Sequence, residues 1–154
     1  MRYLDIVVLE EDGTEKPLRE LVLGKWTVLY FYPKDNTPGC TTEAKEFTEL
    51  IDEFEKLGFQ MIGISRDFPK SHARFKEKHW LKVRLISDPN AGLHKALGAW
   101  GKKKRYGKEY DGAIRSTFIL NPDGEIVWEK RNVRPKGHAV KVLEEAKRLI
   151  SKKE

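Results

Sequence analysis

The sequence contains one cysteine in 154 residues, so no two cysteines are available for a disulfide within the chain. The disulfide framework that is common in small secreted domains is therefore excluded. A long apolar stretch is also missing from the first residues, which reach Glu10 and Glu11 without one, and we expect neither a signal peptide nor a membrane anchor there. These absences predict a reducing compartment such as the cytoplasm.

Linkers, internal repeats and low-complexity tracts are absent as well. We therefore expect residues 1–154 to form a single domain, which is long enough for a substantial core.

A glycine-rich phosphate-binding motif is missing. The histidines have neither paired helical spacing nor an accompanying cysteine, so we expect no metal site and no cofactor. Exposed or capping positions are expected for His72, His79, His94 and His138. Core or partly buried positions are expected for Trp26, Trp80, Trp100 and Trp128.

The net charge of +6 is unevenly distributed along the chain. Residues 1–67 carry 8 basic and 14 acidic side chains, whereas residues 68–154 carry 22 basic and 10 acidic ones. Such asymmetry can indicate an acidic partner such as nucleic acid, and the most basic segment is 102–105. No nucleic-acid-binding motif accompanies this segment, and residues 98–112 are typical of a solvated polar loop between two ordered elements. A non-enzymatic basic binding module stays open as an alternative function.

Apolar periodicity predicts strands that alternate with helices. The expected strands are 26–32, 59–65, 83–86, 116–120 and 125–129. The expected helices are 40–57, 69–78, 91–97 and 137–151, with an opening hairpin around residues 12–13. The turn at residues 121–124 contains the proline, aspartate and glycine that favour a tight hairpin, so the last two strands should be antiparallel neighbours. This order predicts an α/β protein with a mixed central sheet flanked by helices.

The lone cysteine, Cys40, lies between the strand 26–32 and the helix that follows. Thr37 can serve as the N-cap of that helix and Pro38 as its first residue, which places Cys40 in the first turn. Unpaired N–H groups and the positive end of the helix dipole favour a thiolate at this position, and the thiolate is the reactive form of cysteine. Cys40 is therefore a candidate nucleophile, although an inert buried cysteine is the alternative.

Several motifs resemble those of one protein family. The spacing Pro33-x-x-x-Thr37-x-x-Cys40 matches the peroxidatic motif of the peroxiredoxins. The longer string YFYPKDNTPGCTTEA at residues 30–44 is similar to the bacterioferritin-comigratory-protein (peroxiredoxin Q) subgroup. Segments IGISRD, SH, LISD and RSTFIL follow in the order of that subgroup at residues 62–67, 71–72, 85–88 and 115–120. The resemblance thus covers nearly the whole chain.

This resemblance implies the thioredoxin fold and a thiol-dependent peroxidase that reduces hydrogen peroxide and organic hydroperoxides. Cys40 would attack the terminal peroxide oxygen, become a sulfenic acid and release water or an alcohol. Thr37 would present its hydroxyl to the thiolate and the peroxide. Arg115 would stabilise the thiolate and hold the peroxide oxygens with its planar set of donors.

The resemblance also assigns substrate-binding roles to three residues near the nucleophile. Pro33 would shield the thiolate from water. Gly39 would donate its backbone N–H together with that of Cys40. Glu43 suits the first turn of any helix because of the dipole, and by resemblance it would orient Arg115.

One departure from the subgroup concerns the second, resolving cysteine. Members often carry it five residues after the peroxidatic one, where this chain has Lys45. The chain thus resembles a one-cysteine variant, in which Cys40 sulfenic acid must react with an external thiol or with Cys40 of another subunit. Thioredoxin, glutathione or another thiol could serve as reductant, and both a monomer and a homodimer stay open.

A dithiol–disulfide oxidoreductase on the same fold is a further enzymatic alternative. It requires a Cys-x-x-Cys pair, and Glu43 occupies the place of the second cysteine. The binding-module alternative differs in another way, because it predicts salt-sensitive retention on polyanions and no reactivity with peroxide.

Overall fold

The computed structural model describes residues 1–153 and contains a seven-stranded mixed sheet in the order β2-β1-β5-β4-β3-β8-β9. Its strands are β1 (Val7–Leu9), β2 (Glu15–Pro17), β3 (Trp26–Phe31), β4 (Phe59–Ser65), β5 (Arg84–Ser87), β8 (Ser116–Leu120) and β9 (Ile126–Arg131). Strands β3, β4 and β5 pair in parallel, whereas β8 pairs antiparallel with both β3 and β9. The predicted opening hairpin, formed by β1 and β2, and the predicted β8–β9 hairpin are both confirmed.

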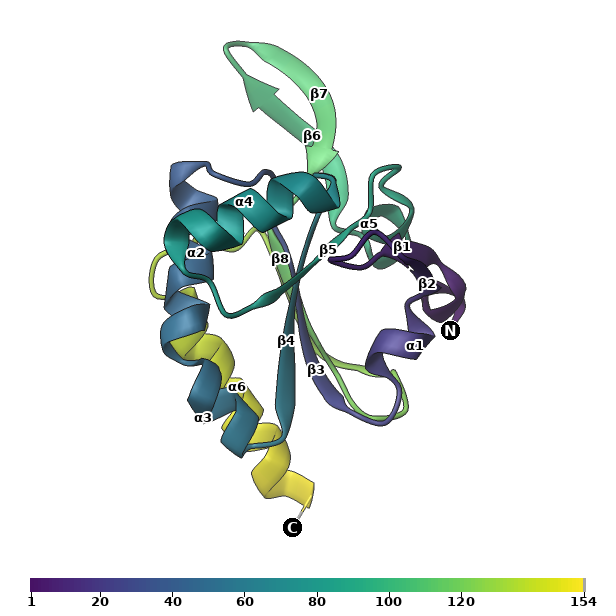
Figure 1. The fold of residues 1–154 in the computed structure, drawn as a ribbon, viewed down its shortest axis with the longest axis vertical. Coiled ribbons are helices and arrows are strands. Elements are labelled where there is room, and N and C mark those ends of the chain that lie inside the picture. Colours follow the sequence, from purple (N-terminus) through teal and green to yellow (C-terminus); the bar gives the residue numbers. More distant parts are fainter. Residues whose placement is uncertain (154) are drawn as a thin grey trace.

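Helices cover both faces of this sheet (Figure 1). One face carries α2 (Pro38–Glu49), α3 (Ile51–Lys56), α4 (Pro69–His79) and α6 (His138–Lys153). The other carries α1 (Arg19–Val22) and α5 (Gly92–Leu97), and a short 3-10 helix precedes β1 at Arg2–Asp5. Alternate residues of β3 point to opposite faces, so Tyr30 packs in the core on the α2 side and Phe31 in the core on the α5 side. Burial on both faces explains why β3 is a continuous apolar run.

The predicted helix 40–57 is interrupted at Leu50, where the backbone leaves helical geometry (φ −101°, ψ 4°). The carbonyl of Leu50 accepts N–H bonds from both Glu53 and Phe54, so a new helix begins directly after the break. Phe47 and Phe54 lie on either side of it and pack with ring centroids 6.2 Å apart. Because the apolar pattern continues across the break, periodicity could not predict it.

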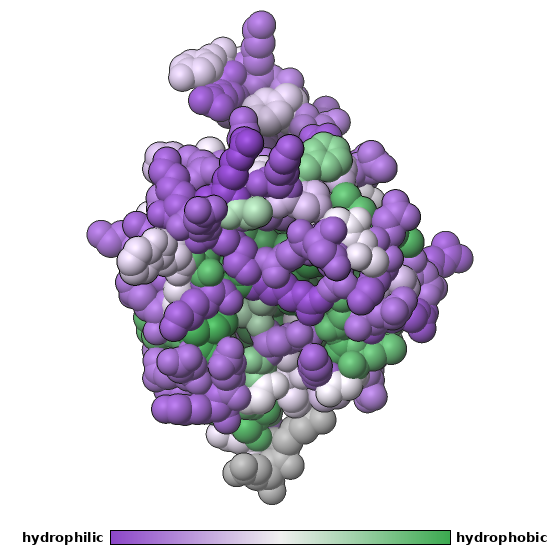
Figure 2. All heavy atoms as spheres, viewed as in Figure 1, coloured by the Kyte–Doolittle hydropathy of each residue, from purple (hydrophilic) through white to green (hydrophobic). Residues whose placement is uncertain are grey.

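The expectation of a polar loop at residues 98–112 is wrong. Strands β6 (Trp100–Arg105) and β7 (Lys108–Ala113) form a separate antiparallel hairpin that projects from the body of the molecule (Figure 1). Tyr106 and Gly107 form its turn with φ values of 53° and 77°, the positive values that suit a tight hairpin. Hydrophilic side chains dominate this hairpin in Figure 2, and because most of its residues are exposed it shows no apolar alternation. The strand signal was therefore missing from the sequence.

The expectation for the histidines is wrong at three positions. His72, His94 and His138 are buried, with exposed fractions of 1%, 0% and 3%. Each has a polar partner that makes burial tolerable: Asp35 at 2.8 Å, Asp88 at 2.7 Å and the Thr117 hydroxyl at 2.8 Å, respectively.

The expectation for the tryptophans fails at Trp80, which is 86% exposed. It is the residue that ends α4, in a left-handed conformation (φ 54°), and its side chain is exposed to solvent. The other three tryptophans are partly buried.

Within residues 1–153, the structure has no helix with the length and apolar character needed to cross a membrane.

Candidate active site

The site forms where β3 ends and α2 begins, at the carboxyl edge of the central strands. The first intrahelical bond of α2 runs from the Thr41 N–H to the Thr37 carbonyl, at 2.9 Å. The N–H groups of Gly39 and Cys40 precede that bond and have no intrahelical acceptor. They are oriented as donors toward a negative charge at the start of the helix.

Thr37 occupies the N-cap position, as expected, with an extended backbone (φ −93°, ψ 153°). Its hydroxyl makes no capping bond and instead donates to the Lys34 carbonyl at 2.8 Å. The expected side-chain cap is therefore wrong. The hydroxyl proton is committed to the loop, which leaves the lone pairs of Oγ1 as the groups that Thr37 can offer to another molecule.

Cys40 is buried in the first turn of α2, with 1% of its surface exposed. Arg115, directly before β8, directs Nη2 at the cysteine Sγ at 3.3 Å. The same guanidinium donates from Nη1 to Glu43 Oε1 at 2.7 Å. One arginine thus bridges the thiol and a carboxylate one helical turn further along α2, and its side chain is only 14% exposed.

Burial governs the electrostatics of this cluster. Desolvation raises the pKa of Glu43 to about 7, although the charge and hydrogen bond of Arg115 act in the opposite direction. Burial alone would lower the pKa of Arg115, but Glu43 and Cys40 raise it above its ordinary value, so the guanidinium stays charged. Glu43 Oε2 has no hydrogen-bond partner among the described residues. The buried carboxylate is therefore held through one oxygen, by Arg115.

Gly39 is required by a close approach of two elements. A Cβ at this position would lie 3.2 Å from Arg115 Nη2 and 3.2 Å from Cγ of Pro135. Either contact is tighter than ordinary packing, so a side chain here would require Arg115 or Pro135 to shift by a few tenths of an ångström. The loop after β9, which contains Pro135, therefore lies against the first turn of α2.

A hollow of about 450 Å³ opens over Arg115. Pro33 lines it, together with the base of the β6–β7 hairpin and the loop after β9, and the complete lining is Pro33, Lys102, Lys103, Lys104, Ala113, Ile114, Arg115, Asn132 and Val133. Pro33 and Thr37 also line a neighbouring hollow of about 390 Å³. The expected residues Pro33, Thr37, Gly39, Cys40, Glu43 and Arg115 thus gather around one centre.

Sequence reasoning missed the contribution of the β6–β7 hairpin to this centre. Lys103 donates to the Ala113 carbonyl at 2.9 Å, and its pKa is lowered by burial and by the nearby charge of Arg115, with the charge of Cys40 acting in the opposite direction. Its position beside the site depends on the projection of the hairpin, for which the sequence contained no signal.

A buried polar network that anchors the loop before Cys40 was also missed. Asp35 accepts hydrogen bonds from the hydroxyls of Tyr32 at 2.6 Å and Ser71 at 2.7 Å, and its Oδ2 lies 2.8 Å from His72 Nδ1. The Asp35 N–H donates to Asp67 at 2.9 Å. The network fastens the loop to α4, and although its members lie in the segments of sequence similarity at residues 30–44, 62–67 and 71–72, that similarity did not predict their contacts. Among the described residues, no group of three or more metal-ligating side chains is placed to hold a metal ion.

A cysteine in the first turn of a helix, in contact with a largely buried arginine at the edge of a mixed α/β sheet, is the arrangement of a thiol-based redox protein. The AhpC/TSA family model matches residues 3–129, and the chain belongs to this family. It is 48% identical over 140 residues to a protein named putative peroxiredoxin bcp in Helicobacter pylori (strain J99), with 91% of each chain covered. It is 44% identical over 129 residues to peroxiredoxin Bcp of Bacillus subtilis, with 84% of this chain and 82% of the relative covered.

Solved structures agree with these relatives. The structure is similar to that of the bacterioferritin comigratory protein of Xanthomonas campestris, which was studied for alkyl peroxide reduction, with a TM-score of 0.89 and 41% identity over 96% of this chain and 94% of the other. The thioredoxin fold and the assignment to the bacterioferritin-comigratory-protein subgroup are therefore confirmed, with one cysteine in the sequence. The protein is a peroxiredoxin, a thiol-dependent peroxidase, and the non-enzymatic binding module is not favoured.

Proposed function

We propose that Cys40 is the peroxidatic nucleophile of a one-cysteine peroxiredoxin, acting within a single domain and in a reducing compartment such as the cytoplasm. The observation that carries the proposal is the double contact of Arg115, with the Cys40 sulfur at 3.3 Å and with Glu43 at 2.7 Å. A fixed cation on the sulfur favours the thiolate, and the same donor group is available for peroxide oxygens in the transition state.

In the first step the Cys40 thiolate attacks the terminal oxygen of a hydroperoxide. The sulfur–oxygen bond forms as the O–O bond breaks, and the departing alkoxide or hydroxide takes a proton from solvent to leave as an alcohol or water. Arg115 and the N–H groups of Gly39 and Cys40 stabilise the negative charge as it moves from sulfur to oxygen. Thr37 accepts a hydrogen bond from the O–H of the hydroperoxide, since its own proton is held by Lys34.

In the second step an external thiol restores the enzyme, because the chain holds no second cysteine. A thiol RSH attacks the sulfenic sulfur, water leaves, and a mixed disulfide Cys40–S–S–R forms. A second thiol then releases RSSR and the free Cys40 thiol. Since Cys40 is only 1% exposed, the first turn of α2 must open for the mixed disulfide to form. Thioredoxin and low-molecular-weight thiols are both suitable reductants, and Cys40 of a second copy is the alternative partner.

The test is a single-turnover oxidation of the reduced protein by equimolar hydrogen peroxide. Stopped-flow tryptophan fluorescence follows the reaction, and dimedone trapping with intact mass identifies the sulfenic acid. We expect oxidation orders of magnitude faster than that of a free thiol, with no reaction in Cys40→Ser. A rate equal to that of free cysteine would contradict the proposal for this substrate, and the same assay with an organic hydroperoxide would then decide whether Cys40 is peroxidatic at all. A disulfide-linked dimer on a non-reducing gel would replace the external thiol by the second copy.

A further inference from the structure

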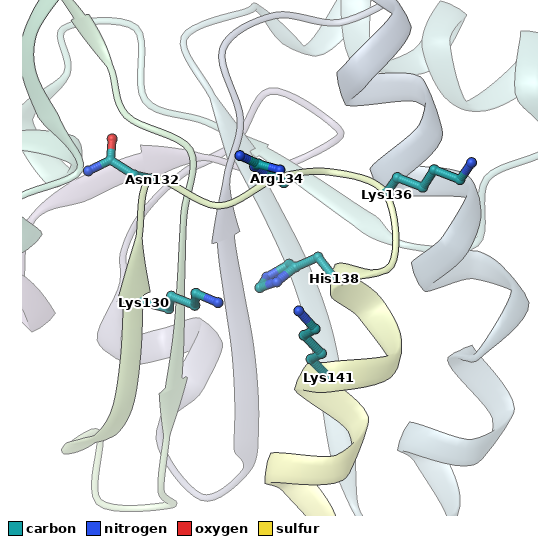
Figure 3. A pocket seen from close by; sticks show the side chains of 6 residues that line it. All are labelled: Lys130, Asn132, Arg134, Lys136, His138 and Lys141. Atoms are coloured by element: carbon teal, nitrogen blue, oxygen red, sulfur yellow. The ribbon is translucent and has the colours of Figure 1, made fainter.

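A third hollow, also of about 390 Å³ but separate from the two described above, lies at the junction of β9, the loop that follows it and the start of α6. We call it the anion hollow, and it is lined by Lys130, Asn132, Arg134, Lys136, His138 and Lys141. In Figure 3 the side chains of Lys130, His138 and Lys141 point toward one another, whereas those of Asn132 and Lys136 point outward. Four of the six lining residues are cationic, and none is acidic.

These cations have no salt-bridge partner in the described part of the chain. Lys130, Arg134, Lys136 and Lys141 form none of the salt bridges found among residues 1–153. A nearby carboxylate, Glu46, accepts the Gly137 N–H at 2.9 Å and is engaged with the backbone. The positive end of the sixteen-residue helix α6 adds to the same potential.

The pKa of the buried His138 responds to this positive potential. Its pKa is lowered to about 4, first by burial and then by the charges of Lys130, Lys141 and Arg115. Its Nε2 lies 2.8 Å from the Thr117 hydroxyl, and Phe47 packs edge-on against the ring. The imidazole is therefore neutral at pH 7, and the positive field in the anion hollow comes from the lysines and the arginine.

The anion hollow lies beside the peroxidatic centre. The Thr117 hydroxyl contacts His138, and Arg115 stands two residues before Thr117 in the chain, a separation of at most about 7 Å. The loop between the two hollows is tied to the centre, since the Val133 N–H donates to the Arg115 carbonyl at 3.0 Å. Asn132 lines both the anion hollow and the hollow over Arg115.

We propose that the anion hollow binds the carboxylates of the low-molecular-weight thiol that reduces Cys40 sulfenic acid, a proposal that rests on the external-thiol step of the proposed function. Lys130 and Lys141 bind the carboxylate, and the loop next to Asn132 leads the thiol toward Cys40. The volume suits a small molecule rather than a protein segment. The chemistry balances as in the second step above, with two molecules of the anionic thiol consumed and one disulfide and one water released.

The first experiment measures how fast preformed Cys40 sulfenic acid reacts with two probes, glutathione with its two carboxylates and neutral 2-mercaptoethanol. The variant is Lys130→Met with Lys141→Met, two exposed side chains, and the matched control is Lys147→Met, an exposed lysine of the same helix outside the hollow. We expect the ratio of the glutathione rate to the 2-mercaptoethanol rate to fall about fivefold to tenfold in the double variant and to stay constant in the control. An equal ratio in both proteins overturns the proposal.

A second experiment does not depend on peroxidase activity. The reduced protein is titrated with S-methylglutathione, which cannot react with Cys40, while NMR follows the His138 ring. A bound carboxylate offsets the charges of Lys130 and Lys141, so the pKa of His138 should rise, and the effect should be lost in the double variant. An unchanged His138 overturns the proposal even if Cys40 is a fast peroxidatic thiol. The same titration is repeated with inorganic phosphate. If phosphate changes the pKa of His138 and S-methylglutathione does not, the anion hollow does not bind a low-molecular-weight thiol, and the proposal is overturned. Failure of peroxide to oxidise Cys40 would count against the proposed function instead.

Discussion

The cationic side chains near Cys40 are of two kinds, the largely buried Arg115 and a set of exposed lysines, and we expect this difference in burial to give them different roles. Arg115 is largely buried, and its two terminal nitrogens contact the Cys40 thiol and the Glu43 carboxylate. The lysines of the β6–β7 hairpin and of the anion hollow are mostly exposed, and those of the hollow have no acidic partner among residues 1–153. A charge in a water-poor site acts strongly on its neighbours, whereas exposed charges are screened by water and salt. We therefore expect Arg115 to control the chemical step and the exposed cations to affect which molecules arrive.

The largest effect is expected from Arg115→Ala. Removing a preorganised donor typically slows a reaction by about a hundredfold to a thousandfold, and we expect such a loss in the oxidation of Cys40 by hydrogen peroxide. Arg74→Ala, an exposed arginine on α4, is the control. An unchanged rate in Arg115→Ala would remove this residue from the mechanism.

A second effect concerns the pH dependence of stability through Glu43. Its pKa in the folded protein, about 7, lies above its ordinary value of 4.5, so the folded state retains a proton that the unfolded chain releases. The contribution of Glu43 to the free energy of unfolding is therefore greatest below pH 4.5 and falls as pH rises to about 7, by on the order of 3 kcal/mol. Glu43→Gln should remove this decline.

Urea unfolding of the wild type and of Glu43→Gln at several pH values between about 4 and 8 measures this difference. Glu49→Gln, at an exposed position of the same helix, is the matched control. Parallel pH profiles for all three proteins would show that burial does not hold the proton on Glu43.

A smaller effect is expected from Thr37→Val. Loss of the hydrogen bond to Lys34 should cost about 1 kcal/mol of stability, whereas loss of an acceptor for the peroxide should reduce the oxidation rate by about tenfold. Thr37→Ser retains the hydroxyl and should recover most of the rate. A loss of stability with an intact rate would limit Thr37 to a role in loop structure. Stopped-flow kinetics and thermal unfolding of the same samples separate the two.

The smallest effect is expected from Lys104→Met on the β6–β7 hairpin. Hydrogen peroxide is neutral and Lys104 is exposed, so the oxidation rate should change by less than about twofold, and only at low salt. The comparison with Arg115→Ala is the purpose of this measurement. A loss at Lys104 as large as that at Arg115 would show that exposure does not separate the two groups of cations.

Much of the fold followed from local patterns, and the errors have a common cause. The order of strands and helices was predictable because an apolar run or a period of three to four residues reports the burial of one segment. The β6–β7 hairpin was missed because it buries little, and the break at Leu50 because the apolar pattern runs through it. His72, His94 and His138 were misjudged because their burial depends on partners such as Asp35 and Thr117 that only folding brings near.

The sequence alone determined that a single cysteine follows a strand and begins a helix, with no second cysteine to resolve its oxidation. These are properties of neighbouring residues and of composition, and they do not depend on folding. The tertiary structure decided what surrounds that cysteine. Arg115 contacts Cys40, which lies 75 residues earlier in the chain, because β8 pairs with β3. Burial then strengthens the electrostatic effect of the Arg115 charge on Cys40. Strand register and exclusion of water belong to the whole fold, so no local pattern could supply them.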